Sequence, residues 1–172
     1  MATPTNRFGD GRTLSYVKRE RIARLWPLFG APNPQSDDIR KFESVGRQPV
    51  AALAAVGQAL DFHESLGVER IRARLQFLKR RWTDRLSSHA NVRFHSPLDA
   101  EQSCATALVE IQGIGSRKLY AHLLEKHRIQ AWPIVRAEFQ GLWVAPHLFT
   151  RLADVDRFAD VMVEIARTGV LA

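Results

Sequence analysis

A stripe of apolar side chains along residues 68–86 constrains the fold of this chain more than any other feature. Its members recur every three or four residues, the spacing of one face of an α-helix: Ile71, Leu75, Leu78, Trp82 and Leu86. At about 1.5 Å per residue, such a helix is about 28 Å long. Arginines and a lysine occupy half of the other positions. The pattern predicts a long helix whose apolar side lies against protein, and its length suits a connector between two bodies.

The residues before this stripe predict a second helix that is preceded by less regular structure. Apolar residues at helical spacing mark a helix over 50–66, for which Pro49 suits the first turn and Gly67 the C-terminal cap. Further upstream we expect a short strand at 13–18, a short helix or irregular segment at 19–29, and a turn-rich loop at 30–38.

The pattern changes from helical spacing to alternation after residue 91. We expect strands at 91–96, 105–113, 129–135 and 142–149, and helices at 115–128 and 151–167. Thr150 is a suitable N-cap for the last helix. The order strand, strand, helix, strand, strand, helix predicts an α/β sandwich in which helices pack on a small sheet.

Composition excludes several classes of protein. The single cysteine, Cys104, cannot form an intramolecular disulfide, and no His/Cys cluster has zinc-ligand spacing. We expect Cys104 to be a buried structural thiol, and we expect no metal. No apolar run reaches the roughly 18 residues that span a bilayer, and the first residues are polar. The sequence therefore predicts a cytoplasmic protein without a membrane partner.

The net charge of +7 and the pI near 10.3 raise the alternative of nucleic-acid binding. Most of this charge is arginine, and the helix at 68–86 carries much of it, so its guanidinium groups could follow a phosphate backbone. The sequence places no aromatic residue among the basic ones on the outer face of this helix. A solvated arginine face over an apolar seam is therefore the favoured interpretation, and nucleic acid is the less favoured partner.

Short motifs supply no catalytic signature. The stretch G-I-G-S at 113–116 precedes a helix, but it matches a strand-to-helix turn better than a phosphate loop. The six histidines are scattered over several expected elements. We interpret them as surface or structurally satisfied histidines rather than as catalysts.

Four segments, taken together, resemble the C-terminal part of the class V aminotransferase family. They are YVKRERIARLWPLF at 16–29, DIRKFESVGRQPVAALAAVGQALDFHESLG at 38–67, GVERIRARLQFLKRRWTDRL at 67–86 and WVAPHLFTRLADVDRFADVM at 143–162. This family comprises pyridoxal phosphate (PLP) enzymes of fold type I, including isopenicillin-N-epimerase-like proteins and cysteine desulfurases. The resemblance runs from about residue 14 to the end of the chain, in one order.

The resemblance implies a division of the chain into three parts. Residues 1–66 would be a remnant of the large cofactor-binding domain, 67–88 a connecting helix, and 89–172 the small C-terminal α/β sandwich domain of a PLP-dependent transferase. In the family, PLP forms a Schiff base with a lysine and an aspartate faces its pyridinium nitrogen. Both groups lie upstream of the matching segments, and residues 1–15 contain no lysine. The resemblance thus implies a truncated member that does not hold PLP covalently and has no catalytic residues of its own.

Two family positions inside the matched segments are altered. Relatives carry Gly-Thr where this chain has Gly46 and Arg47, and that hydroxyl contacts the cofactor phosphate of the neighbouring subunit, a contact that Arg47 could replace as a charged donor. The arginine that binds the substrate carboxylate falls on Trp143. An indole offers one N–H and no charge, so two-pronged carboxylate recognition would be lost.

The leading hypothesis is therefore a class V aminotransferase-like protein without autonomous catalysis. An alternative is an interaction module that completes or pairs with a PLP-enzyme subunit, as a homodimer or together with a relative that carries the large domain. Its basis is the pair of apolar seams at 50–66 and 68–86, which would face the missing domain. Nucleic-acid binding through the arginine-rich helix is the third alternative.

Overall fold

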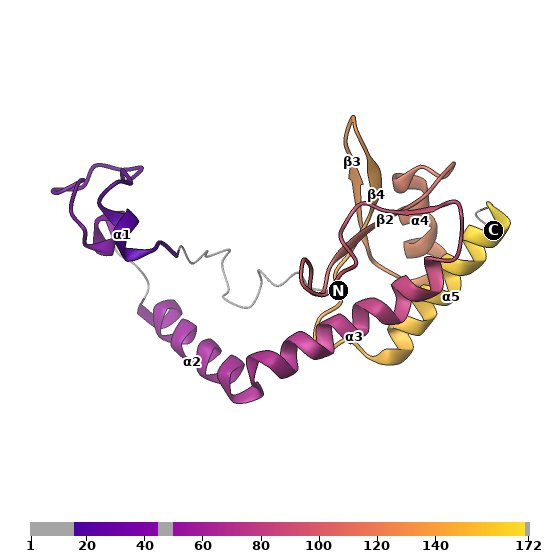
Figure 1. Ribbon diagram of the computed structural model, residues 1–172, viewed down its shortest axis with the longest axis horizontal. Coiled ribbons are helices and arrows are strands. Elements are labelled where there is room, and N and C mark those ends of the chain that lie inside the picture. The colour runs from indigo at the N-terminus through magenta and orange to yellow at the C-terminus, as the bar shows by residue number, and fades with distance from the viewer. Residues whose placement is uncertain (1–15, 45–49, 171–172) are drawn as a thin grey trace. The chain divides into compact units, whose positions relative to one another are not determined.

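The computed structural model describes residues 16–44 and 50–170 and divides the chain into two compact units (Figure 1). The first unit ends at Ser65, and the second runs from Leu66 toward the C-terminus. Each unit is taken by itself below. None of the helices in the described ranges combines the length and the apolarity needed to cross a membrane.

The first unit consists of a short α1 (Arg19–Ile22), a 3-10 helix (Ile39–Glu43) and most of α2 (Val50–Leu66). A buried lysine ties its two short helices together. The Lys41 Nζ donates to the backbone oxygens of Ile22, at 2.6 Å, and Pro34, at 2.9 Å. Asp38 caps the 3-10 helix, since its Oδ1 accepts from the Arg40 N–H at 2.9 Å.

Upstream of α2, the sequence-based predictions are only partly correct. The described part of the predicted strand, 16–18, is not a strand, and the helix predicted within 19–29 ends at Ile22. Pro27 prevents a helix from continuing through the end of this segment, because proline offers no N–H and disfavours helical backbone in the residue before it. The loop at 30–38 and the helix at 50–66 are confirmed.

The second unit begins with the helix that the apolar stripe predicts, α3 (Val68–Leu86). It starts after Gly67, whose φ of +82° favours glycine. Leu78, Trp82 and Leu86 are buried and belong to the core of this unit, where α3 packs against α5 (Leu152–Thr168). The C-terminal part of the stripe, from Leu78 to Leu86, is therefore buried within the C-terminal unit itself.

Four antiparallel strands form the sheet of this unit: β1 (Val92–Phe94), β2 (Ala107–Ile111), β3 (Trp132–Val135) and β4 (Gln140–Val144). Their spatial order is β1-β2-β4-β3, with α4 (Ser116–His127) between β2 and β3 in sequence. In the register, Val109 lies opposite Leu142 and Trp132 opposite Trp143. This arrangement confirms the predicted α/β class, with helices packed on a small sheet.

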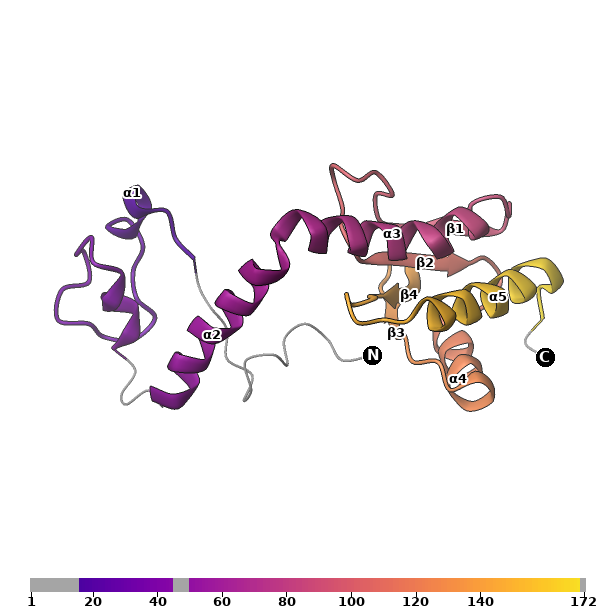
Figure 2. The ribbon, with the colours of Figure 1, turned by 90° about the horizontal axis from the view of Figure 1, so that it is seen from below.

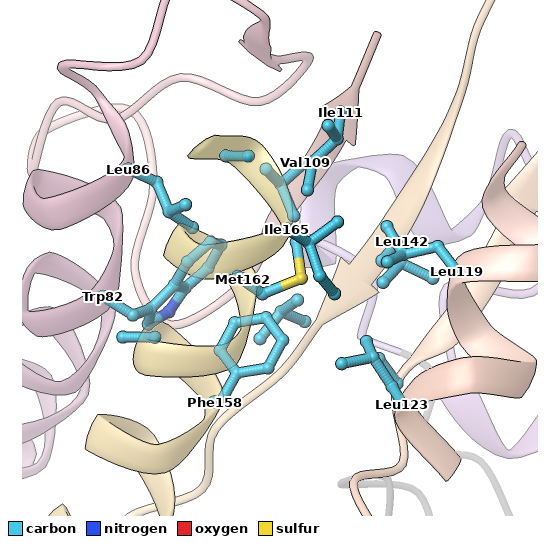
Figure 3. Packing of buried hydrophobic residues seen from close by; sticks show 14 of the residues in the cluster. Trp82, Leu86, Val109, Ile111, Leu119, Leu123, Leu142, Phe158, Met162 and Ile165 are labelled. Atoms are coloured by element: carbon cyan, nitrogen blue, oxygen red, sulfur yellow. The ribbon is translucent and has the colours of Figure 1, made fainter. Parts of the chain in front are cut away.

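The core lies between one face of the sheet and all three helices (Figure 3). Strand residues that alternate toward this face, including Val109, Ile111 and Leu142, meet Leu119 and Leu123 of α4 and Met162 of α5. At its centre the Trp82 ring lies edge-on to Phe158, with ring centroids 5.4 Å apart, and 5.8 Å from Phe94. The core is therefore built from elements at both ends of the unit.

Three local predictions are wrong. The last strand ends at Val144 rather than 149, in a segment where Pro146 can offer no N–H to a strand ladder. Arg151, not Thr150, is the N-cap of α5, because the Thr150 hydroxyl instead accepts from the His147 N–H at 2.9 Å. Cys104 is exposed rather than buried, since it lies in the loop before β2.

Candidate functional site

The second face of the sheet carries the tryptophan that the sequence analysis singles out. Side chains alternate across a strand, so Trp143 lies on the face opposite to buried Leu142 and Val144. It is half-buried, and its register partners are Leu108 on β2 and Trp132 on β3. The Trp132 side chain is 59% exposed. We call this surface the Trp143 face; its residues are Leu108, Glu110, Trp132, Gly141 and Trp143.

A glycine brings β2 and β4 close together on the Trp143 face. A Cβ atom at Gly141 would lie 2.8 Å from the Val109 carbonyl oxygen and 3.1 Å from the Leu108 Cδ1. Contacts that short do not occur between real atoms without movement. Leu108 therefore occupies the space in which a larger residue at 141 would stand, beside Trp143.

An imidazole–carboxylate pair adjoins this face, and sequence reasoning missed it. The His95 Nε2 lies 2.7 Å from the Glu110 Oε2, with side chains 13% and 16% exposed. The Phe139 ring covers the imidazole, with centroids 5.5 Å apart. Only the pairing of β1 with β2, which sets residue 94 opposite 109, could have revealed the pair.

These groups limit the chemistry of the Trp143 face. Trp143 contributes one N–H donor and no charge, and any positive charge on His95 would meet the Glu110 carboxylate. Arg93 lies opposite Glu110 in the register and is exposed. The described residues next to Trp143 therefore form an apolar, aromatic surface, and the charged residues Glu110 and Arg93 lie toward the β1 edge of this face. Gly46 and Arg47 lie outside the described residues, so their predicted phosphate contact stays a prediction.

The glycine-containing turn at 113–116 leads into α4, as the sequence predicts. A cavity of about 550 Å³ adjoins it, lined by residues 113–118, Val135, Gln140, Gly169 and Val170. The Ser116 N–H at the start of α4 donates to the Gln140 Oε1 at 3.2 Å. A protein side chain thus occupies one of the donors that a bound phosphate would use.

The arginines of α3 are engaged in a contact that sequence spacing did not predict. Arg81 makes a two-pronged ion pair with Asp156 on α5, at 2.6 and 2.8 Å, and Arg85 pairs with Asp160. Hydrogen bonds from the Arg81 guanidinium lower the pKa of Asp156. The Arg74 guanidinium donates to the Thr150 carbonyl at 3.1 Å. Two of the six arginines of α3 therefore tie it to α5, and Arg70, Arg72 and Arg80 are exposed, as expected of a solvated face.

An aromatic residue does lie among these arginines, contrary to expectation. Phe77 is 43% exposed, and the guanidinium carbons of Arg74 and Arg81 lie 5.8 and 5.9 Å from its ring centroid. Arg81 also pairs with Asp156 of α5, and Arg74 also donates to the carbonyl of Thr150, which precedes α5. Phe77 therefore lies between two arginines whose guanidinium groups are already engaged by Thr150 and Asp156.

The lysines bear on any covalent attachment of a cofactor aldehyde. All five lysines lie in the described ranges, and three of them, at 18, 118 and 126, are exposed. Lys41 and Lys79 are buried, and the Lys79 Nζ bonds the Pro97 carbonyl at 2.7 Å and the Ser103 hydroxyl. Burial lowers the pKa of Lys79. Both buried amines are thus already bound to oxygen atoms of the protein.

The model of the class-V aminotransferase family matches residues 27–136, more than half of the chain. The chain belongs to this family. The match confirms the resemblance given by the four sequence segments, and it places the protein in a family of PLP-dependent enzymes.

Individual relatives and solved structures agree with this assignment. The chain is 27% identical over 133 residues to the isopenicillin N epimerase of Amycolatopsis lactamdurans, covering 77% of this chain and 33% of the epimerase. The fold is similar to the apo cysteine desulfurase of Thermococcus onnurineus NA1 (TM-score 0.71, 17% identity, 90% of this chain and 42% of that one). It is also similar to the cysteine desulfurase CsdA of Escherichia coli (TM-score 0.68, 15% identity, 90% and 42%).

The class V aminotransferase-like chain spans about a third of the epimerase and about two fifths of these desulfurases. Neither buried lysine offers a free amine to a cofactor aldehyde. The two buried amines bind backbone or hydroxyl oxygens, and among the described lysines only Lys118 lines the 550 Å³ cavity. The roles assigned to residues 46, 47 and 143, and the division at 66 and 88, stay predictions.

Proposed function

We propose that these 172 residues form a class V aminotransferase-like protein that, by itself, catalyses neither transamination, racemisation nor desulfuration. The observation that carries the proposal is Trp143, which the resemblance aligns with the family's carboxylate-binding arginine. The indole lies between Leu108 and Trp132 in the register. A substrate carboxylate would find an aromatic surface there, without the two parallel N–H donors of a guanidinium.

The lysines support the same proposal. A Schiff base needs a neutral amine that a cofactor aldehyde can reach. Burial favours the neutral form of Lys79, but its amine lies inside the loop that holds Ser103, where it has two oxygen partners. Lys41 is similarly held by two carbonyl oxygens. We infer that PLP does not form a stable internal Schiff base with this chain.

Borohydride trapping tests this proposal directly. Purified protein mixed with an equal concentration of PLP should show no protein-bound aldimine absorbance, and reduction followed by peptide mass mapping should find only scattered, substoichiometric labelling. A full-length class V aminotransferase, treated in parallel, should be labelled at one lysine. A stoichiometric adduct at one lysine would contradict the proposal. Lys118 is the first position to inspect because it lines the 550 Å³ cavity, and a Lys118→Arg variant would then identify the site.

A second candidate function, pairing with another polypeptide, is favoured by the surface of the first unit. We propose that this unit docks onto a second copy of the chain or onto a relative that carries the large domain. Large apolar side chains of the unit are widely exposed: Tyr16 86%, Trp26 67%, Leu28 92%, Phe29 61% and Val50 76%. Trp26, Leu28 and Phe29 are also close in sequence, and large apolar side chains exposed together are typical of association surfaces.

Light scattering and co-purification test the pairing. The wild-type chain should exceed monomer mass, or should retain a co-expressed family member that carries the large domain. A Trp26→Ser/Leu28→Ser/Phe29→Ser variant should lose this association by tenfold or more, because it removes three exposed apolar side chains that are close in sequence. A Val170→Ser control, 61% exposed in the second unit, should behave as wild type. A clean monomer that retains no such relative would overturn the pairing proposal.

A further inference from the structure

Two histidines at the C-terminal end of α4 point their outer ring nitrogens at one another. The Nε2 atoms of His122 and His127 are 3.3 Å apart, and their ring centroids are separated by 5.1 Å with an angle of 59° between the planes. Both residues are partly buried. They lie on α4, whose inward residues Leu119 and Leu123 belong to the core. The pair is therefore separate from the residues of the Trp143 face.

The end of the helix explains why this pair is not visible in the sequence. Residues five apart are rotated by about 140° in a regular helix, so they do not share a face. His127 is the last residue of α4, because Arg128 adopts left-handed backbone, with φ of 56°, and donates to the Leu124 carbonyl at 3.1 Å. The two imidazoles therefore approach each other across the last turn of the helix, although their backbone positions do not share a face.

The separation of the two nitrogens matches the bite of a metal ion. Zinc binds imidazole nitrogen at about 2.0–2.1 Å with tetrahedral angles, which sets two nitrogens on one ion about 3.3 Å apart. We propose that His122 and His127 form a two-imidazole site for a borderline divalent ion such as Zn²⁺, Ni²⁺ or Cu²⁺. Imidazole suits these ions better than it suits Mg²⁺ or Ca²⁺. The described residues offer no group of three or more His, Cys, Asp or Glu ligands, so water completes the coordination shell.

The protonation state and the local charges support this site. Metal ions bind neutral imidazole, and burial, followed by the charges of His127 and Lys126, lowers the pKa of His122. The C-terminal end of a helix also carries partial negative charge that favours a cation. Lys126 opposes the ion, whereas Glu125 on the same turn attracts it. With two protein ligands, the bound ion should exchange readily and remain accessible from solution.

Calorimetric titration of the full chain with ZnCl₂ or NiCl₂ near pH 7.5 tests the site. We expect one ion per chain, and at least about tenfold weaker binding when either ring is removed in His122→Gln or His127→Gln, because the second imidazole acts at high effective concentration. A His89→Gln variant is the matched control, since it removes a histidine outside α4 and should leave the affinity unchanged. In NMR spectra the ring signals of His122 and His127 should shift together at the same metal concentration.

Several results would overturn the metal site. One is wild-type affinity in either single variant, and another is equal weakening by His89→Gln. Unchanged ring signals of both histidines at millimolar zinc would also reject it, and would leave an N–H···N hydrogen bond as the role of the pair. Circular dichroism of each variant should match wild type, because neither histidine belongs to the buried core. A variant that unfolds would be replaced by His122→Asn or His127→Asn, which also remove the ring and keep a polar side chain.

Discussion

Replacing Trp82 with alanine should lower the free energy of unfolding of the C-terminal unit by about 3–5 kcal/mol. Trp82 is 1% exposed and lies between α3, β1 and α5, with its ring against Phe94 and Phe158. Removing it leaves a cavity that three elements would have to fill. Urea unfolding followed by far-ultraviolet circular dichroism measures the loss without relying on tryptophan fluorescence.

Two further variants sharpen this test. Trp82→Phe should cost much less, because the Trp82 Nε1 is buried without a hydrogen-bond partner among the described residues, and phenylalanine removes that unsatisfied group while keeping an aromatic ring. Trp132→Ala, at a site that is 59% exposed, should change stability by less than about 1 kcal/mol. Equal losses in Trp82→Ala and Trp132→Ala would show that Trp82 is not at the centre of the core.

The second large effect is expected at Gly141. Gly141→Ala should destabilise the C-terminal unit by about 1–3 kcal/mol, because the added methyl group meets the Val109 carbonyl oxygen at 2.8 Å as well as the Leu108 side chain. The side chain can move aside, whereas the carbonyl belongs to the β2–β4 ladder. Thermal or urea unfolding of the variant measures the cost.

A second substitution separates the two contacts at Gly141. In a Leu108→Ala background the side-chain clash is absent, so the cost of Gly141→Ala should fall but not vanish, because the Val109 carbonyl remains. Gly115→Ala is the matched control: no atom lies within 4 Å of its added Cβ, and its φ is ordinary for alanine. A Gly141→Ala loss no larger than that of Gly115→Ala would contradict the close approach of β2 and β4.

Periodicity predicted the long elements well because local spacing determines them. The bounds of α3 match the predicted 68–86 because the apolar stripe is continuous along the helix. Gly67, with a positive φ, separates α3 from the preceding helix α2. The strands were located by alternation, although each of the four is shorter than expected. The short segments near residues 16–29 were predicted less well, because a four-residue helix leaves no periodic pattern to detect.

The site features were hidden because they depend on residues far apart in sequence. Arg81 and Asp156 are 75 residues apart, and so are Arg85 and Asp160. His95 meets Glu110 only after β1 pairs with β2. The exposure of Cys104 and the position of Phe77 also follow from tertiary packing. The position of Trp143 was identified by family resemblance rather than by any property of the indole itself.

The pairing of α3 with α5 also bears on how the C-terminal unit is made in the cell. The two helices run side by side in the same direction (Figure 2), and both ion pairs between them join residues 75 apart in sequence. The same offset separates Asn91, beyond the end of α3, from Ala166 of α5, whose carbonyl accepts from the Asn91 amide. Proteins emerge from the ribosome N-terminus first. Leu78, Trp82 and Leu86 therefore stay without their α5 partners until residues 152–168 have been synthesised. This unit should gain its stability late and in one step, with its first helix open to chaperones throughout translation.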